Sequence, residues 1–525
     1  MSERTLELEL GLDDADDVDA LRKAVARAAG LRAADLQHLH VVRRSLDARR
    51  GRVRFHLTVS LEPPKAPDQL GQPWPIAVRP PARVVIVGDG PAGLFCAWQL
   101  ARAGVASIVV DRGKTVQPRR VDLKGLNQHG VVDEDSNYCF GEGGAGTYSD
   151  GKLYTRATKR GDVRDVLEIL ALHGAPADIL VDARPHIGSN LLPKVITALR
   201  ERLEGCGVQF RFGARVVDLE VQGGRVRAVR LADGGELPCD ACVIATGHSA
   251  RDVYRMLAAR GARLEAKPLA VGVRIEHPQL LINELQYGRD ASHPRLPNAA
   301  YRIVEPVDGR GVFSFCMCPG GFIVPAATEP SGLVVNGMSL KRRDSPFANS
   351  GLVVAVELDD AARAGHRGPF AMLEVQRHLE EAALAAGGGK LRAPAARAAD
   401  FVARRASTSL PVTSYQPGVG SADLAAVLDA SGVAIAERLR RALQVFDQRM
   451  PGYASGDAVL IGVETRTSAP VRVPRDVSTL ESPDLLGLYP AGEGAGFAGG
   501  IVSAALDGMR VASAILQTLK KLSRS

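Results

Sequence analysis

The sequence has few of the features that mark secreted or membrane-embedded proteins. It contains only seven cysteines in 525 residues, an odd number scattered over a large chain, which does not make a disulfide framework. No stretch reaches the roughly 18 uninterrupted apolar residues of a membrane span, and residues 1–4 do not begin a signal peptide. We therefore expect a cytoplasmic protein without a membrane partner.

A strong excess of charge of one sign is also missing. The 66 Lys and Arg residues stand against 59 Asp and Glu, a formal net charge of +7. This mild excess suits an anionic cofactor or substrate, and no dense basic run with interleaved aromatic residues predicts a nucleic-acid partner. A metal site is not expected either. Cys239 and Cys242 have C-x-x-C spacing, but no second pair supplies further zinc ligands, so buried thiols are favoured.

A glycine-rich string follows the apolar run 83–87 and opens a helical pattern. Its residues are Gly88, Asp89, Gly90, Pro91, Ala92 and Gly93. In a dinucleotide-binding fingerprint the first glycine permits the tight strand-to-helix turn, the second lets the backbone approach a pyrophosphate, and the third lets the helix pack against the strand. The pyrophosphate then rests at the helix N-terminus, where free N–H groups and the helix dipole favour negative charge.

The context of this string completes a β-α-β unit. Gly104 ends the helical pattern, and a second apolar run over 107–110 leads to Asp111. An acid about twenty residues beyond the glycines is placed to accept hydrogen bonds from the adenosine ribose. We predict a dinucleotide site that includes Asp111 and its neighbour Arg112.

The chain divides into five segments, in keeping with the two or three domains that its length predicts. The patterns of 1–62 predict a small β-α-β module, and the prolines of 63–81 predict a stiff linker. Residues 82–261 and 461–525 are expected to form the two parts of the dinucleotide-binding domain. Residues 262–460 hold mixed strands and helices, which we interpret as an inserted substrate domain.

Glycine-rich and strand patterns alternate after the first β-α-β unit. The segment 143–147 has no strand before it, so it is either an ordinary loop or backbone that passes close to a bound cofactor. From Val208, short strands and glycine turns predict a three-stranded meander that feeds a buried strand ending at Thr246 and Gly247. A helical run over 370–386 ends at three glycines.

The order of these motifs resembles the glutathione-reductase-type FAD superfamily, because a last glycine-rich segment, 487–501, again precedes an apolar helix. Longer strings are similar to the bacterial family usually called uncharacterised FAD-dependent dehydrogenases. These strings are residues 140–156, 244–254, 272–278, 313–321 and 462–476. The resemblance covers essentially the whole chain.

The resemblance implies an α/β fold, with a Rossmann-like FAD-binding domain of parallel sheet and β-meander, an inserted α+β substrate domain and a small N-terminal α+β module. It implies FAD, bound non-covalently, rather than NAD. Asp111 would hold the adenosine ribose, and Val216 would give backbone contacts to adenine. Other residues would lie along the pyrophosphate, the ribityl chain and the flavin: Gly143, Gly144, Ala145, Gly146, Thr147, Thr246, Gly247, Gly492, Glu493, Gly499, Gly500 and Ile501. Many relatives have Asp in place of Glu493, so the Asp contact to a ribityl hydroxyl is not carried over.

Three side chains are candidates for the chemistry. Arg466 offers a planar fork that clamps a carboxylate, or it pairs internally with Glu464. Lys152 either places a cation beside the flavin or is a solvated surface lysine. Cys316, in a C-x-C pair with Cys318, is either a redox thiol or part of the wall of a substrate pocket.

The leading hypothesis is an FAD-dependent oxidoreductase that exchanges a hydride between flavin N5 and a small-molecule substrate. No second fingerprint follows a strand, so NAD(P)H is expected only as a transient electron donor. An RNA-modifying flavoprotein and a non-catalytic flavin-bound sensor or scaffold are the alternatives. The substrate and the oligomeric state are left open.

Overall fold

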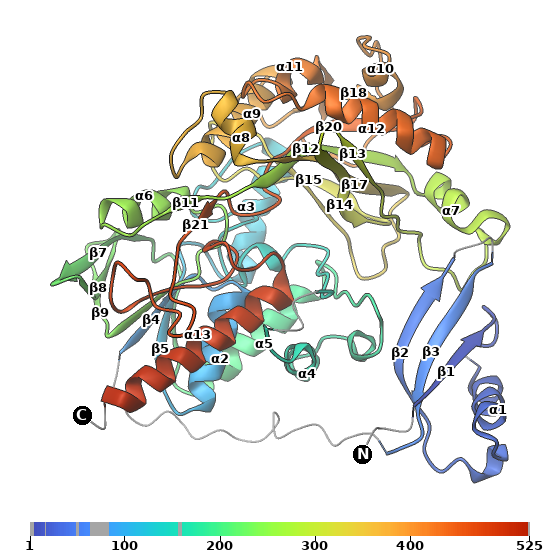
Figure 1. Cartoon of the computed structure of the whole chain (residues 1–525), viewed down its shortest axis with the longest axis horizontal. Coiled ribbons are helices and arrows are strands. Elements are labelled where there is room, and N and C mark those ends of the chain that lie inside the picture. The colour runs from blue at the N-terminus through green and yellow to red at the C-terminus, as the bar shows by residue number, and fades with distance from the viewer. Residues whose placement is uncertain (1–4, 16, 49–51, 64–82, 156–159, 523–525) are drawn as a thin grey trace.

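The computed structural model describes residues 5–15, 17–48, 52–63, 83–155 and 160–522. All but the first residue of the predicted linker, 63–81, lies outside these ranges. One half of the molecule is built on a parallel sheet, the other half on a larger sheet above it, and a small three-stranded module lies beside them (Figure 1).

The parallel sheet has five strands in the order β22-β10-β4-β5-β6. They are β4 (Val84–Val87), β5 (Ser107–Val110), β6 (Gln209–Arg211), β10 (Ala241–Ile244) and β22 (Leu488–Pro490). Strands β4 and β10 are buried along their whole length. Strands covered on both faces read as unbroken apolar runs, which is the pattern that the sequence shows. Cys239 and Cys242 are buried, as predicted.

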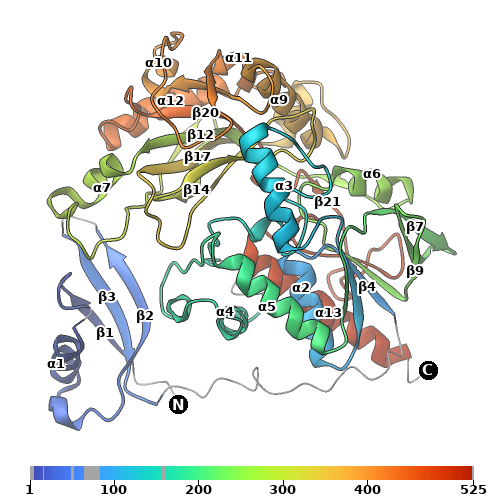
Figure 2. The same cartoon turned by 180° about the vertical axis from the view of Figure 1, so that it is seen from behind.

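Helices cover one face of this sheet (Figures 1 and 2). They are α2 (Pro91–Arg102), α4 (Val163–Leu172), α5 (Leu192–Gly205) and α13 (Ile501–Leu522). Helix α13 packs so closely on α2 that a Cβ added at Gly508 would lie 2.0 Å from the carbonyl oxygen of Ala92. The end of the chain therefore completes the half of the molecule that the glycine fingerprint begins.

An antiparallel meander and helix α6 (Arg251–Ala259) contribute to the core on the other face. The meander consists of β7 (Val216–Gln222), β8 (Arg225–Leu231) and β9 (Glu236–Pro238). The prediction that the meander begins at Val208 is wrong. That stretch forms β6, which pairs in parallel with β5 at the edge of the five-stranded sheet, because its alternating residues suit an edge strand as well as a hairpin.

The upper half is built on a seven-stranded sheet in the order β13-β14-β17-β12-β20-β18-β19, antiparallel except for its last pair. The strands are β12 (Leu269–Pro278), β13 (Val304–Val307), β14 (Arg310–Cys318), β17 (Phe347–Val356), β18 (Ala393–Arg397), β19 (Val419–Ser421) and β20 (Val459–Glu464). Helices α9 (Ala371–Gly387) and α12 (Ala436–Arg449) pack on it. Helix α9 matches the predicted run and ends at Gly388, whose φ is 81°.

Shorter elements connect these layers. They are α3 (Val116–His129), α7 (Gln279–Tyr287), α8 (Leu358–Arg363), α10 (Ala398–Val402), α11 (Leu424–Leu428), β11 (Glu265–Ala266), β15 (Phe322–Pro325), β16 (Val335–Met338) and β21 (Val471–Arg472). Among the described residues, no helix combines the length and the apolar character needed to cross a membrane.

The N-terminal module differs from the predicted β-α-β arrangement by one strand. It contains β1 (Thr5–Leu10), α1 (Val18–Ala29), β2 (His40–Asp47) and β3 (Arg54–Ser60), with sheet order β1-β3-β2. Strand β2 carries no clear alternation of burial, so period-two patterning does not reveal it. The backbone of Arg44 hydrogen bonds to Val181 and Ala183, which attaches the module to the lower half.

Candidate FAD and substrate site

A cleft opens at the carboxyl ends of β4, β5 and β10, where open α/β sheets bind their ligands. It brings together six separate segments of the chain. The predicted cofactor-binding residues that line it are Gly88, Gly90, Pro91, Ala92, Asp111, Arg112, Gly144, Ala145, Gly146, Val216, Thr246, Gly247, Glu493, Gly500 and Ile501.

The fingerprint glycines meet the steric demands expected of them. Gly88 has φ of 105°, and a Cβ there would lie 2.4 Å from the carbonyl oxygen of Ala245. A Cβ at Gly93 would lie 1.9 Å from the Gly88 carbonyl oxygen, so this glycine permits close helix–strand packing. A Cβ at Gly144 would lie 2.9 Å from the Cα of Gly90. The second glycine segment therefore lies directly against the first.

The cleft fits an elongated anionic dinucleotide such as FAD. Helix α2 begins with Gly90 as its N-cap and Pro91 in its first turn, and no side chain caps it, so its N-terminal dipole faces the cleft without a competing acceptor. Gly247 and Gly500 also line the cleft, and a Cβ at either would meet no atom within 4 Å. Backbone at these positions is thus bordered by open space that a cofactor can fill.

Two carboxylates lie under the fingerprint. Asp111 accepts backbone hydrogen bonds from Asp89, Gly113 and Gly141 at 2.8–3.0 Å, which fixes its position at the cleft. Asp89 is fully buried, and one of its carboxylate oxygens has no partner. Burial, with the nearby charges of Asp111 and Glu142, raises the pKa of Asp89 well above its usual value.

Five predicted cofactor-binding residues do not line the cleft: Gly93, Gly143, Thr147, Gly492 and Gly499. Thr147 is buried and donates from its hydroxyl to the Glu142 carbonyl at 2.7 Å. The amide of Gly492 donates to Asp507 at 2.8 Å. These positions support the wall behind the lining residues, because their polar groups already have partners within the protein. Contacts between FAD and individual residues stay predictions.

Glu493 is a half-buried carboxyl on the cleft wall. Burial raises its pKa to about 7, with the positive charge of Lys267 acting against the shift and the charge of Cys316 adding to it. A carboxyl with this pKa gains and loses a proton near neutral pH. Glu493 therefore places a titrating group in the cleft.

Arg466 does not pair with Glu464, so that interpretation is wrong. Its guanidinium contacts the Glu380 carboxylate at 3.0 and 3.2 Å and donates to Thr328 at 2.7 Å. Arg251 reaches the same carboxylate at 2.9 Å. Because all three charged groups are buried, Arg466 has no free fork for a substrate carboxylate. The cluster instead joins the upper half to helix α6 beside the cleft.

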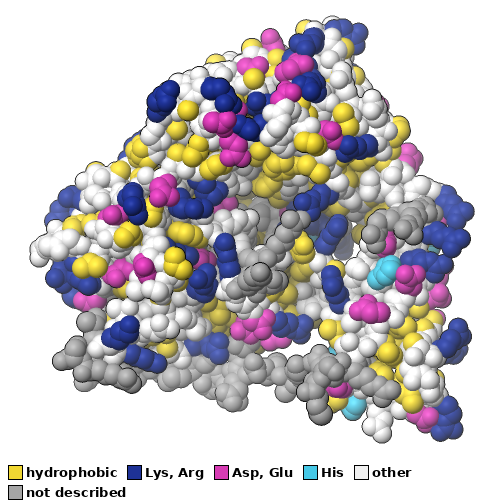
Figure 3. Space-filling view, in the orientation of Figure 1, with side chains coloured by type: hydrophobic (Ala, Val, Ile, Leu, Met, Phe, Trp, Pro, Cys, Tyr) yellow, Lys and Arg dark blue, Asp and Glu magenta, His cyan; other side chains and the backbone are white. Residues whose placement is uncertain are grey.

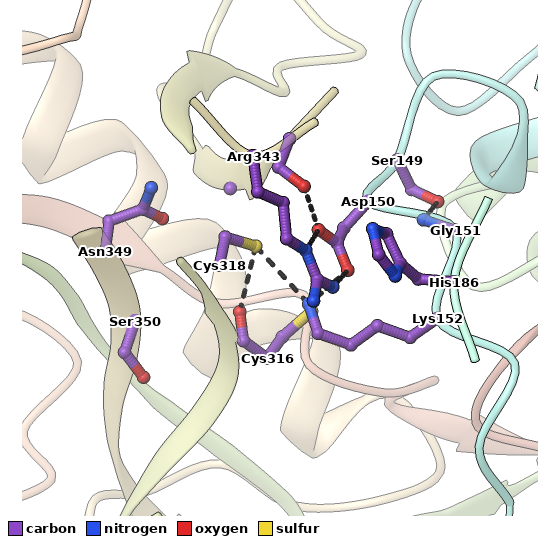
Figure 4. A network of polar contacts seen from close by, with 12 residues as sticks. Ser149, Asp150, Gly151, Lys152, His186, Cys316, Cys318, Arg343, Asn349 and Ser350 are labelled. Atoms are coloured by element: carbon purple, nitrogen blue, oxygen red, sulfur yellow. Dashed lines mark hydrogen bonds and ion pairs between the residues drawn. The ribbon is translucent and has the colours of Figure 1, made fainter. Parts of the chain in front are cut away.

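Lys152 is held in a network on the inner face of the large sheet (Figure 4). Its ammonium lies 3.6 Å from the sulfur of Cys316 and 3.4 Å from that of Cys318. It also forms an ion pair with Asp150 at 2.9 Å. Burial acts to lower the Lys152 pKa, but the charges of the two cysteines and Asp150 raise it above its usual value. Although 34% of the side chain is exposed, its ammonium is held by three partners and is not a freely solvated one.

Asp150 anchors this network. It is almost fully buried and pairs with Arg343 at 2.7 Å, and Ser339 donates a hydrogen bond to it. Arg274, on β12, donates to the carbonyl oxygen of Cys316 at 3.0 Å and pairs with Glu464 at 2.8 Å. The thiols thus lie among cations that strands of the upper sheet and a loop of the lower half hold in fixed positions.

Sequence reasoning missed the partners that make these clusters. Glu380 lies within an ordinary amphipathic helix, and Arg274 within an apolar strand. A charged residue in a strand that is otherwise buried, such as Arg274, is the one available signal. The pairing of Arg343 with Asp150 leaves no trace in sequence spacing, since the two are 193 positions apart.

Comparison with known families agrees with this geometry. Residues 81–133 match the family model described as an FAD binding domain, residues 167–268 that of pyridine nucleotide-disulphide oxidoreductase, and residues 268–467 that of FAD-dependent protein, C-terminal domain-like. Residues 1–62 match a domain of unknown function. An uncharacterized protein of Clostridium beijerinckii is 40% identical and covers 98% of this chain and 99% of its own length. The chain belongs to the family of this clostridial protein.

The chain is accordingly an FAD-dependent oxidoreductase, and FAD is its cofactor. Among solved structures, the flavin-dependent brominase Bmp2 aligns with a TM-score of 0.37 at 14% identity, over 84% of this chain and 81% of that one. Glycine oxidase from Bacillus cereus aligns with a TM-score of 0.33 at 11% identity, over 83% and 95%. Placement of this flavoprotein in the glutathione-reductase-type superfamily stays a prediction.

Proposed function

We propose that this flavoprotein exchanges a hydride between flavin N5 and a small-molecule substrate, and that Glu493 holds or releases the accompanying proton. The observation that carries the proposal is the position of Glu493 on the wall of the glycine-lined cleft with a pKa of about 7. When bound, FAD supplies the hydride chemistry. The residues of the chain bind the cofactor, orient the substrate and carry the proton.

The remaining groups support this division of roles. The backbone of the fingerprint and the N-terminus of α2 favour the pyrophosphate, and the open faces at Gly247 and Gly500 leave room for the cofactor. The Cys316 charge contributes to the raised pKa of Glu493, which supports an electrostatic link between the cleft and the network around Lys152. We therefore expect the substrate between the cleft and that network.

Basic side chains do not gather in one patch on the face drawn in Figure 3, where they lie scattered among acidic ones. Phosphate contacts dominate RNA binding, so nothing on this face favours the RNA-modifying alternative. A small-molecule partner remains the proposal.

The test is anaerobic reduction of the purified, FAD-loaded protein. NADH or NADPH is added and the flavin absorbance is followed. Rapid bleaching identifies a nicotinamide as electron donor, and a metabolite that bleaches the flavin when nicotinamides do not identifies a dehydrogenase. Either result supports the proposal. If neither class of donor reduces the flavin, while dithionite does, the protein is a flavin-bound sensor or scaffold and the proposal is wrong.

A matched variant tests the proton role. Replacing Glu493 by Gln keeps the size of the side chain and removes its titration. We expect the pH dependence of flavin reduction between pH 6 and 8, on either side of the pKa of about 7, to flatten in the variant while FAD content is retained. Unchanged pH dependence contradicts the assignment of the proton to Glu493.

A further inference from the structure

We propose that Cys316 and Cys318 form a dithiol pair that reduces small-molecule disulfides, with Cys316 attacking the substrate and Cys318 resolving the mixed disulfide. This deepens the proposed function by naming a substrate class for the same site. Repeated turnover of the cysteine pair rests on the proposed flavin function, whereas a single round of thiol–disulfide exchange does not.

The backbone around the pair is unusual. Cys316 has φ of 45°, in the left-handed region that favours glycine. The register of β14 against β17 shifts between Phe315 and Cys318, so that the cysteine lies in a bulge. Bulges re-aim side chains beside functional sites. A non-glycine residue kept in this conformation is strained, and such residues cluster where function requires them.

The two sulfurs differ in access. Cys316 is half-buried and Cys318 is completely buried. The Cys318 thiol donates a hydrogen bond to the Cys316 carbonyl oxygen at 3.3 Å, and the Lys152 ammonium lies within 3.6 Å of both sulfurs. An incoming molecule therefore meets Cys316 first, with the second thiol already in contact behind it. This is the order that attack followed by resolution requires.

The charges around the pair favour a thiolate at Cys316. The neighbouring Cys318 thiol lowers the pKa of Cys316 well below its usual value, and Lys152 and Arg274 add to the shift against the effect of burial. The Cys316 sulfur and burial raise the pKa of Cys318. A thiolate is the nucleophile in thiol–disulfide exchange, so the pair holds one reactive sulfur and one protonated sulfur.

The exchange balances without a further reagent. The Cys316 thiolate attacks one sulfur of R–S–S–R, forms a mixed disulfide and releases R–S⁻. Cys318 then attacks the Cys316 sulfur of the mixed disulfide, and its proton leaves with the second thiol, R–SH. Two electrons pass from the cysteine pair, which becomes a disulfide, to the substrate, which becomes two thiols.

The test uses the FAD-loaded protein and dithiobis-nitrobenzoate, an aromatic disulfide whose released thiolate is coloured. We expect wild type to release two thiolates per site in a fast phase, leaving a Cys316–Cys318 disulfide that mass spectrometry detects. Cys318→Ser is expected to release one and to retain the adduct on Cys316. Cys316→Ser is expected to lose the fast phase. Cys206 is a half-buried cysteine outside the site. Cys206→Ser is therefore the matched control, and it is expected to keep the fast phase.

A second measurement needs no cysteine variant. Alkylation of wild type by iodoacetamide at pH 6.5 is expected to be about fivefold or more faster at Cys316 than at Cys206, since a thiol of ordinary pKa is about 1% thiolate there. Lys152→Met should move the alkylation profile of Cys316 to higher pH, and Lys152→Arg should restore it. Equal rates at Cys316 and Cys206, or a wild-type adduct that is never resolved, overturn the proposal.

The outcomes separate the two proposals. If the protein shows fast exchange but no donor reduces its flavin, the dithiol proposal stands and the hydride proposal is wrong. If a donor reduces the flavin but fast exchange is missing, the hydride proposal stands and the disulfide substrate is wrong.

Discussion

The cluster of Glu380 with Arg251 and Arg466 gives the sharpest prediction about stability. These side chains are 1–6% exposed, and both guanidinium groups contact one carboxylate at 2.9–3.2 Å. Glu380→Gln keeps the volume but leaves buried Arg466 without its counter-charge and Arg251 with only the partly exposed Glu329, 3.2 Å away. Breaking a buried ion pair by removing one partner costs about 3–5 kcal/mol. At roughly 2–4 °C per kcal/mol for a domain of this size, we expect Tm to fall by about 6 °C or more.

The neighbouring residue provides the control. Glu381 pairs with Arg377 at 2.8 Å, but the two side chains are 40% and 35% exposed. An exposed pair contributes about 0–1 kcal/mol, so Glu381→Gln should shift Tm by no more than about 4 °C. Thermal denaturation followed by circular dichroism and flavin fluorescence measures both variants. Equal shifts would refute the argument that burial sets the cost.

The same cluster predicts acid sensitivity. The arginines outweigh the effect of burial and lower the pKa of Glu380 to about 2, from an ordinary value of 4.5. A carboxyl whose folded pKa is depressed adds stability above its unfolded pKa and loses it as pH falls towards the folded one. Of the wild-type stability, about 3 kcal/mol should therefore disappear between pH 4.5 and 2, and Glu380→Gln should lack that part of the loss.

Three further predictions concern the cleft. Gly93→Ala should destabilise the protein by about 1–3 kcal/mol and reduce its FAD content, because the added Cβ has no room. Gly125→Ala, in open space within α3, is the control and should stabilise the protein slightly. Urea titration measures the stability and flavin absorbance the FAD content, and equal effects of the two substitutions would contradict the reasoning. Because burial raises the pKa of Glu493, wild type should lose part of its stability as pH rises from 4.5 to about 7. Glu493→Gln should not show that part of the loss. A variant whose Tm depends on pH as wild type does would contradict this prediction. Asp507→Asn should weaken FAD retention during dialysis, because Asp507 holds the Gly492 amide; full retention excludes that role.

The sequence predicted the parts of the fold and site that depend on local pattern. Three motifs can be recognised from a few neighbouring residues each: the fingerprint from Gly88 to Gly93, the acid at Asp111 and the segment around Glu493. The fold brings all three to one cleft. The full fold class, with its inserted domain and N-terminal module, followed from the family resemblance, whereas the apolar runs of the parallel strands and the glycine turns of the β-α-β unit are local signals.

What the sequence did not reveal depends on contacts between distant segments. Arg466 meets Glu380 across 86 positions and Lys152 meets Cys318 across 166, and no spacing rule connects such pairs. Strand β2 was missed because its partial burial leaves its residues with little periodicity, and β6 was assigned to the meander because an alternating run does not show which strand it pairs with. The C-x-C pair was visible, but the cations that surround it were not.

The discontinuous parallel sheet has a consequence for biosynthesis. Strand β22 pairs with β10 and helix α13 covers α2, yet both are translated about 380 residues after β5. Strand β22 begins about 245 residues after the end of β10, so at roughly 5–20 residues per second β10 stays an open edge of the unfinished sheet for on the order of 12–50 seconds. Glu493, Gly500 and Ile501 line the cleft and are translated in the same last stretch, so the FAD site is complete only after that stretch has been made.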